Sequence, residues 1–283
     1  MTMAVFSITL SEQQIKELKK AHHLEISKSD NATIDAIFSL SDCKITLYKS
    51  KKAVFQGKDI SAYQSIYQAK ISEHSGSDEV GTGDYFGPVV VAACYINQAL
   101  LNLIDGHLIQ DSKQLDDPTI RKIAPKLIEV LPHSVLIVDN AKYNHIHKQH
   151  NLNAIKALLH NQAYKHLEKK IKQLPQLNVV DQFTPENLYY NYLKNEKNVI
   201  RTLHFETKAE SKYLAVACAS IIARYTFLLV WDKMEEKYTF NFPKGSGELV
   251  DHAIVRFVQQ YGKDTLNLVA KTHFKNTQKS ENL

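Results

Sequence analysis

The chain has 283 residues, 44% of them hydrophobic and 23% charged, which is typical of a globular protein, and its length favours two domains. We find neither an apolar stretch of 18 residues nor a secretory signal, so we expect no membrane span, and we expect the three distant cysteines (Cys43, Cys94 and Cys218) to be reduced thiols in the cytoplasm. The net charge of +5 is compatible with a polyanionic partner but does not prove one.

Residues 1–66 are predicted to form a small α+β domain. The pattern predicts a strand over 3–9 and a helix over 11–21 that begins at Ser11 as N-cap. Three short β-rich runs follow, at 33–39, 43–49 and 53–56. A second helix is expected after them, at 59–73. Four lysines gather near one hairpin: Lys49, Lys51, Lys52 and Lys58. They either solvate an edge strand or contact nucleic acid, and the sequence alone leaves both interpretations open.

Residues 75–277 show a different pattern, in which strands alternate with helices. The predicted strands are 76–80, 87–97, 134–139, 177–181 and 200–205. The predicted helices are 117–131, 151–173, 186–195, 211–237 and 247–261. This alternation favours an α/β domain with a partly parallel sheet. The first two strands are joined by a turn too short for a crossover, so we expect an antiparallel hairpin.

The stretch GSDEVGTGDYFG, residues 76–87, places Asp78 and Glu79 at the head of an apolar run. A phosphate loop would need a lysine where Thr82 stands, and the glycine spacing and the following strand do not fit a dinucleotide-binding loop. No Lys or Arg lies between residues 75 and 88 to pair with the two acids. Partly buried carboxylates without a partner favour a Mg²⁺-type site with oxygen ligands. A solvated acidic turn is the alternative.

Other acids stand where ligands usually bind in α/β folds. Asp181 ends the apolar run LNVVD, although a surface N-cap is an equal alternative. Glu210 precedes a helix rich in small residues, which can pack closely on a sheet and hold this acid at its N-terminal edge. Lys208 and Lys212 flank Glu210 and would hold phosphates, balance its charge or simply be solvated. Glu206 is a rival for Glu210, and spacing does not decide between them.

Five stretches together resemble the type 2 ribonucleases H, and among them the HIII type. They are GSDEVGTGDYFGPVVVAA (76–93), QDSKQL (110–115), VVDQF (179–183), TKAESKYLAVACASIIAR (207–224), and FPKGSGELVD (242–251) with AKTHFKNT (270–277). The resemblance implies a ribonuclease H-like mixed sheet flanked by helices. The N-terminal domain resembles the TATA-binding-protein-like extension of the HIII type, which implies a substrate-binding role.

The resemblance also implies an endonuclease that hydrolyses the RNA strand of RNA–DNA hybrids with two Mg²⁺ or Mn²⁺ ions and leaves 5′-phosphate and 3′-hydroxyl ends. It assigns catalysis and metal binding to Asp78, Glu79, Asp181 and Glu210, and prefers Glu210 to Glu206. The substrate contacts that the resemblance implies are Gly81, Thr82, Gly83 and Lys113. By their charge and their positions in the sequence, Lys208 and Lys51 are further candidates for phosphate contacts. We expect a monomer. A non-catalytic hybrid-binding protein is the alternative from another functional class.

Overall fold

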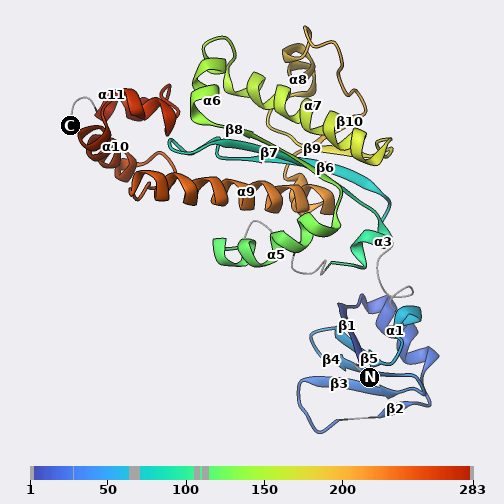
Figure 1. Ribbon diagram of the computed structural model, residues 1–283. Coiled ribbons are helices and arrows are strands. Elements are labelled where there is room, and N and C mark those ends of the chain that lie inside the picture. The colour runs from blue at the N-terminus through green and yellow to red at the C-terminus, as the bar shows by residue number, and fades with distance from the viewer. Residues whose placement is uncertain (1–2, 28, 64–70, 105–108, 110–114, 281–283) are drawn as a thin grey trace. The chain divides into compact units, whose positions relative to one another are not determined.

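The computed structural model describes residues 3–27, 29–63, 71–104, 109 and 115–280 (Figure 1). The chain divides into two compact units, Met1–Lys70 and Ile71–Leu283, and each has hydrophobic clusters of its own.

In its described residues, the first unit is a five-stranded antiparallel sheet with the helix α1 packed on it (Figure 1). The strands follow the order β1-β5-β4-β3-β2. Their bounds are β1 Ala4–Thr9, β2 Ile26–Ser27, β3 Ile34–Ser39, β4 Cys43–Tyr48 and β5 Lys52–Gly57. Alternate residues of the strands, such as Phe38 and Ile45, are fully buried together with Leu18 of α1. This one-sided burial explains the alternating sequence pattern.

The helix α1, Glu12–Ala21, begins as the sequence predicts. The Ser11 hydroxyl accepts a hydrogen bond from the Gln14 backbone at 3.2 Å, and the Gln14 side chain accepts one from the Ser11 backbone at 2.8 Å. This reciprocal pair satisfies two amides at the helix start. The helix predicted over 59–73 is wrong at its end, because residues 71–73 are not helical; residues 64–70 lie outside the described part of the chain.

The second unit contains a mixed sheet in the order β10-β9-β6-β7-β8. The strand bounds are β6 His74–Val80, β7 Val89–Ile96, β8 His133–Val138, β9 Asn178–Asp181 and β10 Leu203–Glu206. β6 pairs antiparallel with β7, which confirms the predicted hairpin, and β7 pairs antiparallel with β8. β9 runs parallel to both β6 and β10. The predicted α/β class with a partly parallel sheet is confirmed.

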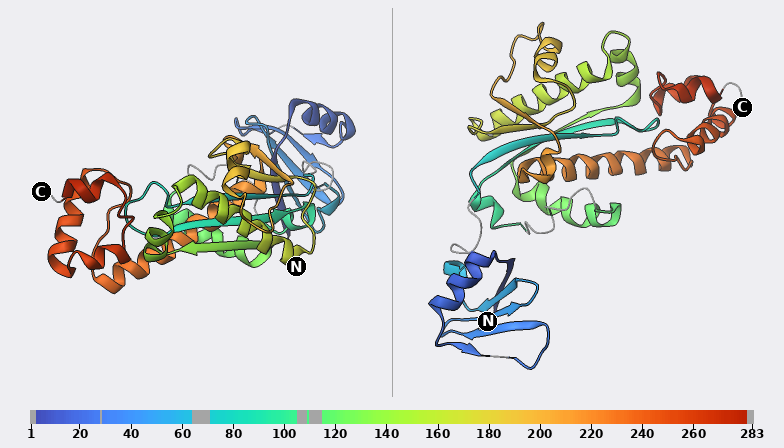
Figure 2. Two further views of the ribbon diagram at one scale, coloured as in Figure 1. Left: turned by 90° about the horizontal axis from the view of Figure 1, so that it is seen from above. Right: turned by 180° about the vertical axis from the view of Figure 1, so that it is seen from behind.

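Helices cover both faces of this sheet (Figures 1 and 2). α9 packs on β6 and β7 from one side, and α7 packs on β7 and β8 from the other. α5 lies against the outer side of α9, whereas α10 and α11 pack together beyond its C-terminal end (Figure 2). The helix bounds are α3 Gln98–Leu101, α5 Asp117–Val130, α6 Asn140–His147, α7 Leu152–Ile171, α8 Glu186–Tyr192, η2 Ala209–Ser211, α9 Leu214–Tyr238, α10 Glu248–Tyr261, η3 Asp264–Leu268 and α11 Lys275–Ser280.

The helix α9 corrects the expectation that no long apolar stretch exists. By length and composition alone it would suffice to cross a membrane, with a mean hydropathy of 1.8 over its most apolar 18-residue window. Within the fold, 61% of that window is buried. The apolar side chains of α9 join the largest hydrophobic cluster of the second unit, so their composition is explained by packing on β6 and β7.

The contact between α9 and β6 depends on Gly76. A methyl group at Gly76 would lie 2.4 Å from the backbone nitrogen of Val216 and 2.8 Å from the carbonyl carbon of Ala215, both in α9. These are backbone atoms, which cannot rotate away. The small residues of this helix thus meet a glycine on the strand, as the sequence pattern indicated.

We expect Gly76→Ala to lower the free energy of unfolding of the second unit by about 1–3 kcal/mol, because it forces α9 away from the sheet. Trp231 lies in α9 and is the only tryptophan of the chain, so its fluorescence in a urea titration reports on this unit. Gly83→Ala is the matched control, since no heavy atom lies within 4 Å of the added methyl group. Equal urea midpoints for the two variants would contradict the proposed close packing.

Candidate active site

Acidic residues collect at one edge of the second sheet, where three parallel strands end. In the register, Ser77 lies beside Val180, and Asp181 lies beside Glu206. One residue further along β6, Asp78 therefore comes next to Asp181. The carboxyl ends of parallel strands are the usual place for ligands in such sheets. The fold thus brings together acids that are about a hundred residues apart in the sequence.

Asp78 is buried on the α9 side of the sheet. Its carboxylate accepts hydrogen bonds from the Ser220 hydroxyl of α9 and, at 2.8 Å, from the backbone amide of Glu79. Burial, followed by the nearby charges of Glu79 and Asp181, nevertheless raises the pKa of Asp78 to about 8. Without a cation, this carboxyl group therefore keeps its proton at neutral pH. A divalent ion would relieve the same repulsion that holds the proton.

Asp181 connects β9 to the segment that carries Glu210. Its carboxylate accepts a hydrogen bond from the backbone amide of Ala209 at 2.9 Å. Ala209 begins η2, directly after Lys208, whose backbone is left-handed with φ of 54°. This sharp entry places the buried side chain of Glu210 between the end of β9 and the start of α9. Helix formation resumes only at Leu214, so the helix predicted from 211 begins three residues later than expected.

Glu79 faces the opposite side of the sheet, toward α7. Its carboxylate forms an ion pair with Lys156 and accepts a hydrogen bond from His160 at 2.9 Å. The other ring nitrogen of His160 lies 2.7 Å from the Ser77 hydroxyl. Burial alone would raise the pKa of Glu79, but His160 and Lys156 together lower it. Glu79 is therefore ionised and neutralised within the protein.

This pairing corrects the sequence argument that no base is available to the acids of residues 76–87. The bases come from a distant helix, one turn apart on α7, in the run KALLH. The Lys156 ammonium also lies 4.0 Å from the centre of the Phe183 ring. Lys156 and His160 are thus site residues that we missed in the sequence. The only sequence signal was two bases four residues apart with apolar residues between them.

The carboxylates suit a hard cation, although they do not yet enclose one. Among the residues that the structure describes, no three His, Cys, Asp or Glu side chains converge closely enough to hold one ion. The reason is geometric, since Asp78 faces α9 whereas Glu79 faces α7. Carboxylates at neighbouring strand ends, with the pKa of Asp78 raised by burial and then by the nearby acids, are nevertheless the donor type that Mg²⁺ and Mn²⁺ prefer.

Glu206, the rival of Glu210, has a different environment. It is half-exposed and pairs with Lys212, whose hydrogen bond and charge lower its pKa. His204 lies 3.5 Å away on the same strand. Glu206 is therefore neutralised at the surface, whereas Glu210 is buried beside the Asp181 loop. This contrast favours Glu210 as the fourth acid.

The glycine-rich turn follows β6 directly. Gly81 has a positive φ of 86°, and a methyl group there would lie 2.2 Å from the Pro88 carbonyl oxygen, so the turn needs glycine at this position. Thr82 is half-buried and Gly83 is exposed. The tip of the turn thus presents backbone to solvent next to the acidic edge.

The structure describes two of the three lysines that we predicted to contact the substrate. Lys208 is exposed at the start of η2, next to the acidic edge. Lys113 lies outside the described residues. Lys51 belongs to the first unit, where it is exposed and forms an ion pair with Glu12 at 2.9 Å.

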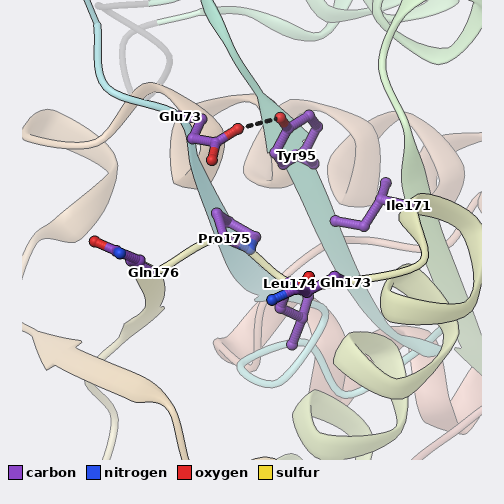
Figure 3. A pocket seen from close by; sticks show the side chains of 7 residues that line it. All are labelled: Glu73, Tyr95, Ile171, Gln173, Leu174, Pro175 and Gln176. Atoms are coloured by element: carbon purple, nitrogen blue, oxygen red, sulfur yellow. Dashed lines mark hydrogen bonds between the residues drawn. The ribbon is translucent and has the colours of Figure 1, made fainter.

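A separate pocket of about 420 Å³ lies at the opposite end of β6 (Figure 3). Its lining residues are Glu73, Tyr95, Ile171, Gln173, Leu174, Pro175 and Gln176. The Tyr95 hydroxyl donates a hydrogen bond to Glu73 at 2.8 Å across one wall (Figure 3). The pocket lies at the start of β6, whereas Asp78 lies near the end of this strand. The pocket therefore does not belong to the acidic site.

Comparison with known proteins defines the class. The ribonuclease HII family matches residues 75–277, and a family described as a domain of unknown function (DUF3378) matches residues 6–79. The second unit is therefore a type 2 ribonuclease H domain. Ribonuclease HIII of Geobacillus sp. (strain WCH70) is 37% identical over 98% of both chains, and ribonuclease HIII of Bacillus subtilis (strain 168) is 37% identical over 100% of this chain and 98% of that one. The chain belongs to the ribonuclease HIII family.

Solved structures agree with this assignment. The crystal structure of Bst-RNase HIII in complex with Mn²⁺ is 35% identical and matches with a TM-score of 0.72 over 99% of this chain and 98% of that one. The ribonuclease H2 from Pyrococcus horikoshii OT3 is 26% identical, with a TM-score of 0.61, and covers 75% of this chain. The resemblance inferred from the sequence motifs is thus confirmed, as is the ribonuclease H-like fold.

Proposed function

We propose that the protein is an endonuclease that hydrolyses the RNA strand of RNA–DNA hybrids with divalent metal ions. The observation that carries this proposal is the juxtaposition of Asp78 and Asp181 at one sheet edge, where burial, followed by repulsion from Glu79 and Asp181, raises the pKa of Asp78 to about 8. Such a site favours cation binding. Membership of the ribonuclease HIII family and the Mn²⁺-bound structure of a relative support the same reaction.

Four carboxylates would hold two ions, either Mg²⁺ or Mn²⁺: Asp78, Glu79, Asp181 and Glu210. When bound, such ions activate a water molecule and stabilise the leaving 3′-oxygen, which yields 5′-phosphate and 3′-hydroxyl ends. Asp78 gives up its proton, and its carboxylate stays oriented by the Ser220 hydroxyl. The Ala209 amide orients the carboxylate of Asp181 through a hydrogen bond. Glu79, which pairs with Lys156 and His160 in the structure, would contribute to the metal site only after leaving these partners.

The substrate would be recognised by its shape and backbone. The turn Gly81–Gly83, which contains Thr82 and is exposed at Gly83, lies next to the acids, and its backbone is suited to contact ribose 2′-hydroxyl groups, which distinguish RNA from DNA. Lys208 would contact phosphate near the reacting bond, and Lys113 further along the strand. The first unit would add binding area through exposed lysines, Lys51 among them.

We place the protein in the cytoplasm, as a monomer. All three cysteines are free and buried, which suits a reducing compartment. Each of the two units buries a core of its own, so neither needs a second copy of the chain to fold.

A cleavage assay tests the proposed function. A duplex with a run of labelled ribonucleotides opposite DNA should be nicked within the RNA strand when Mg²⁺ or Mn²⁺ is present, and stay intact with a chelator. Matched DNA and RNA duplexes should remain intact in every condition. A hybrid that is bound but never cut would favour the non-catalytic binding protein instead. A duplex with a single ribonucleotide should be cut weakly, as the resemblance to the HIII type implies.

A further inference from the structure

A second buried charge lies behind the glycine-rich turn, at Lys271. This side chain is fully buried between the turn and α6. Its ammonium donates hydrogen bonds to the carbonyl oxygens of Asp84 at 2.8 Å and Gly87 at 2.6 Å, with a longer contact to Phe86 at 3.4 Å. Burial lowers the pKa of Lys271 to about 7, an effect that the charge of Asp84 opposes. A buried amine is costly unless its donors are used, and here they converge on three carbonyl groups within residues 84–87.

The backbone around Lys271 binds the same segment. The Lys271 amide donates to the Tyr85 carbonyl at 2.8 Å, and the Gly87 amide donates to the Val269 carbonyl at 2.9 Å. Phe86 and Ala270 form an antiparallel bridge between them. Residues 269–271 thus act as a short partner strand for residues 85–87. The lysine side chain adds its hydrogen bonds to this pairing from the buried side.

Two further segments hold the base of the turn, residues 84–87. The Asp84 carboxylate accepts a hydrogen bond from the Gly245 amide at 2.6 Å, and the Gly245 carbonyl accepts one from Tyr85 at 2.9 Å. The Asn140 side chain of α6 donates to the Gly87 carbonyl at 2.8 Å. Residues 84–87 are therefore held by three segments that lie far away in the sequence.

The tip of the turn has no such support. Gly83 is exposed, and no heavy atom lies within 4 Å of where its side chain would begin. The tip leaves β6 at the acidic edge and returns through residues 84–87. The position of Gly83 relative to Asp78 is consequently set by residues 84–87, because Gly83 itself is exposed and has no close neighbour on its side-chain side.

Resting on the proposed function, we propose that Lys271 is a positioning residue for the substrate-facing turn. Its ammonium gathers the carbonyl groups of residues 84–87, so that the backbone of 81–83 is held ready to receive the ribose of the hybrid. Lys271 itself touches neither the substrate nor the acids. Its effect is to lower the cost of ordering the turn when substrate binds.

The test replaces Lys271 by methionine, which keeps the length of the side chain and removes its donors. Lys271→Met should raise KM for the hybrid about tenfold and change kcat less than about threefold, because binding loses a pre-ordered turn while the acids keep their places. Peptide amides of residues 81–87 should exchange hydrogen faster in the free protein. Lys279→Met, at an exposed site of α11, is the matched control and should change neither quantity.

Each outcome decides one question. If the wild-type protein does not cut the hybrid, the proposed function fails, and amide exchange in Lys271→Met still tests the clamp. If a folded Lys271→Met variant has wild-type KM and wild-type exchange at 81–87, the inference is overturned. If this variant does not fold, Asn140→Ala removes the other side-chain donor to Gly87 and should raise KM about threefold. An unchanged KM in that variant also overturns the inference.

Discussion

Asp78→Asn should abolish hybrid cleavage and, in the absence of metal ions, make the second unit more stable at pH 8. The amide keeps the shape of the carboxylate but is a poor ligand for hard cations, so we expect activity to fall by on the order of 10³-fold or more. Binding of the intact hybrid should be largely retained. A loss of activity with a gain in stability identifies a group that serves function at a cost to folding.

The gain in stability follows from the direction of the pKa shift. The pKa of Asp78 is about 8 in the folded protein and about 3.8 in a flexible chain. Between these values the folded state binds more protons than the unfolded state, so the free energy of unfolding falls as pH rises through this window. The loss is complete above pH 8 and amounts to on the order of a few kcal/mol. The side chain of asparagine does not titrate in this pH range, so Asp78→Asn does not show this fall in the free energy of unfolding.

Urea titrations followed by Trp231 fluorescence, with chelator at pH 5 and pH 8, measure this effect. The wild-type midpoint should fall between the two pH values, and the midpoint of Asp78→Asn should fall less. Adding Mg²⁺ should raise the wild-type midpoint and leave the variant unchanged. Asp232→Asn, at the exposed ion pair with Arg121, is the control and should show neither the gain nor the loss of activity. If Asp78→Asn cuts the hybrid normally, the assignment of the metal site is wrong.

The local sequence patterns predicted most secondary elements because their causes are local. Ser11 and Gln14 lie three residues apart and cap α1 without help from the rest of the chain. The acids at strand ends could also be picked out, since an apolar run followed by Asp181 already indicates the end of a buried strand. The choice of Glu210 over Glu206 needed the family resemblance, because it depends on how β10 and η2 fold back on β9.

Contacts between distant segments could not be predicted in this way. The pairing of Glu79 with Lys156 and His160 requires that α7 cross the sheet opposite β6, which no local pattern encodes. The burial of Lys271 is similar, because a lysine in the run AKTHF is indistinguishable from a solvated one until residues 84–87 lie against it. Asp139 shows that a similar local pattern can have another cause. It directly follows β8, much as Asp181 ends β9, yet its side chain caps α6 by accepting a hydrogen bond from the Lys142 amide.

Removal of residues 1–70 should weaken hybrid binding about 10- to 100-fold while leaving the chemical step nearly unchanged, because a tethered second binding unit adds affinity without touching the reacting bond. The first unit buries its own core and the second unit buries others, so the deletion should leave the fluorescence midpoint of Trp231 in place. Fluorescence anisotropy of a labelled hybrid in chelator measures affinity, and single-turnover cleavage at saturating enzyme measures the chemical step.

The dependence of affinity on salt should also become shallower, since lysines of the first unit no longer contact phosphates. An unchanged affinity and salt slope would show that the first unit has a role other than holding the hybrid, whereas a slower single-turnover rate would mean that it helps to shape the acidic site.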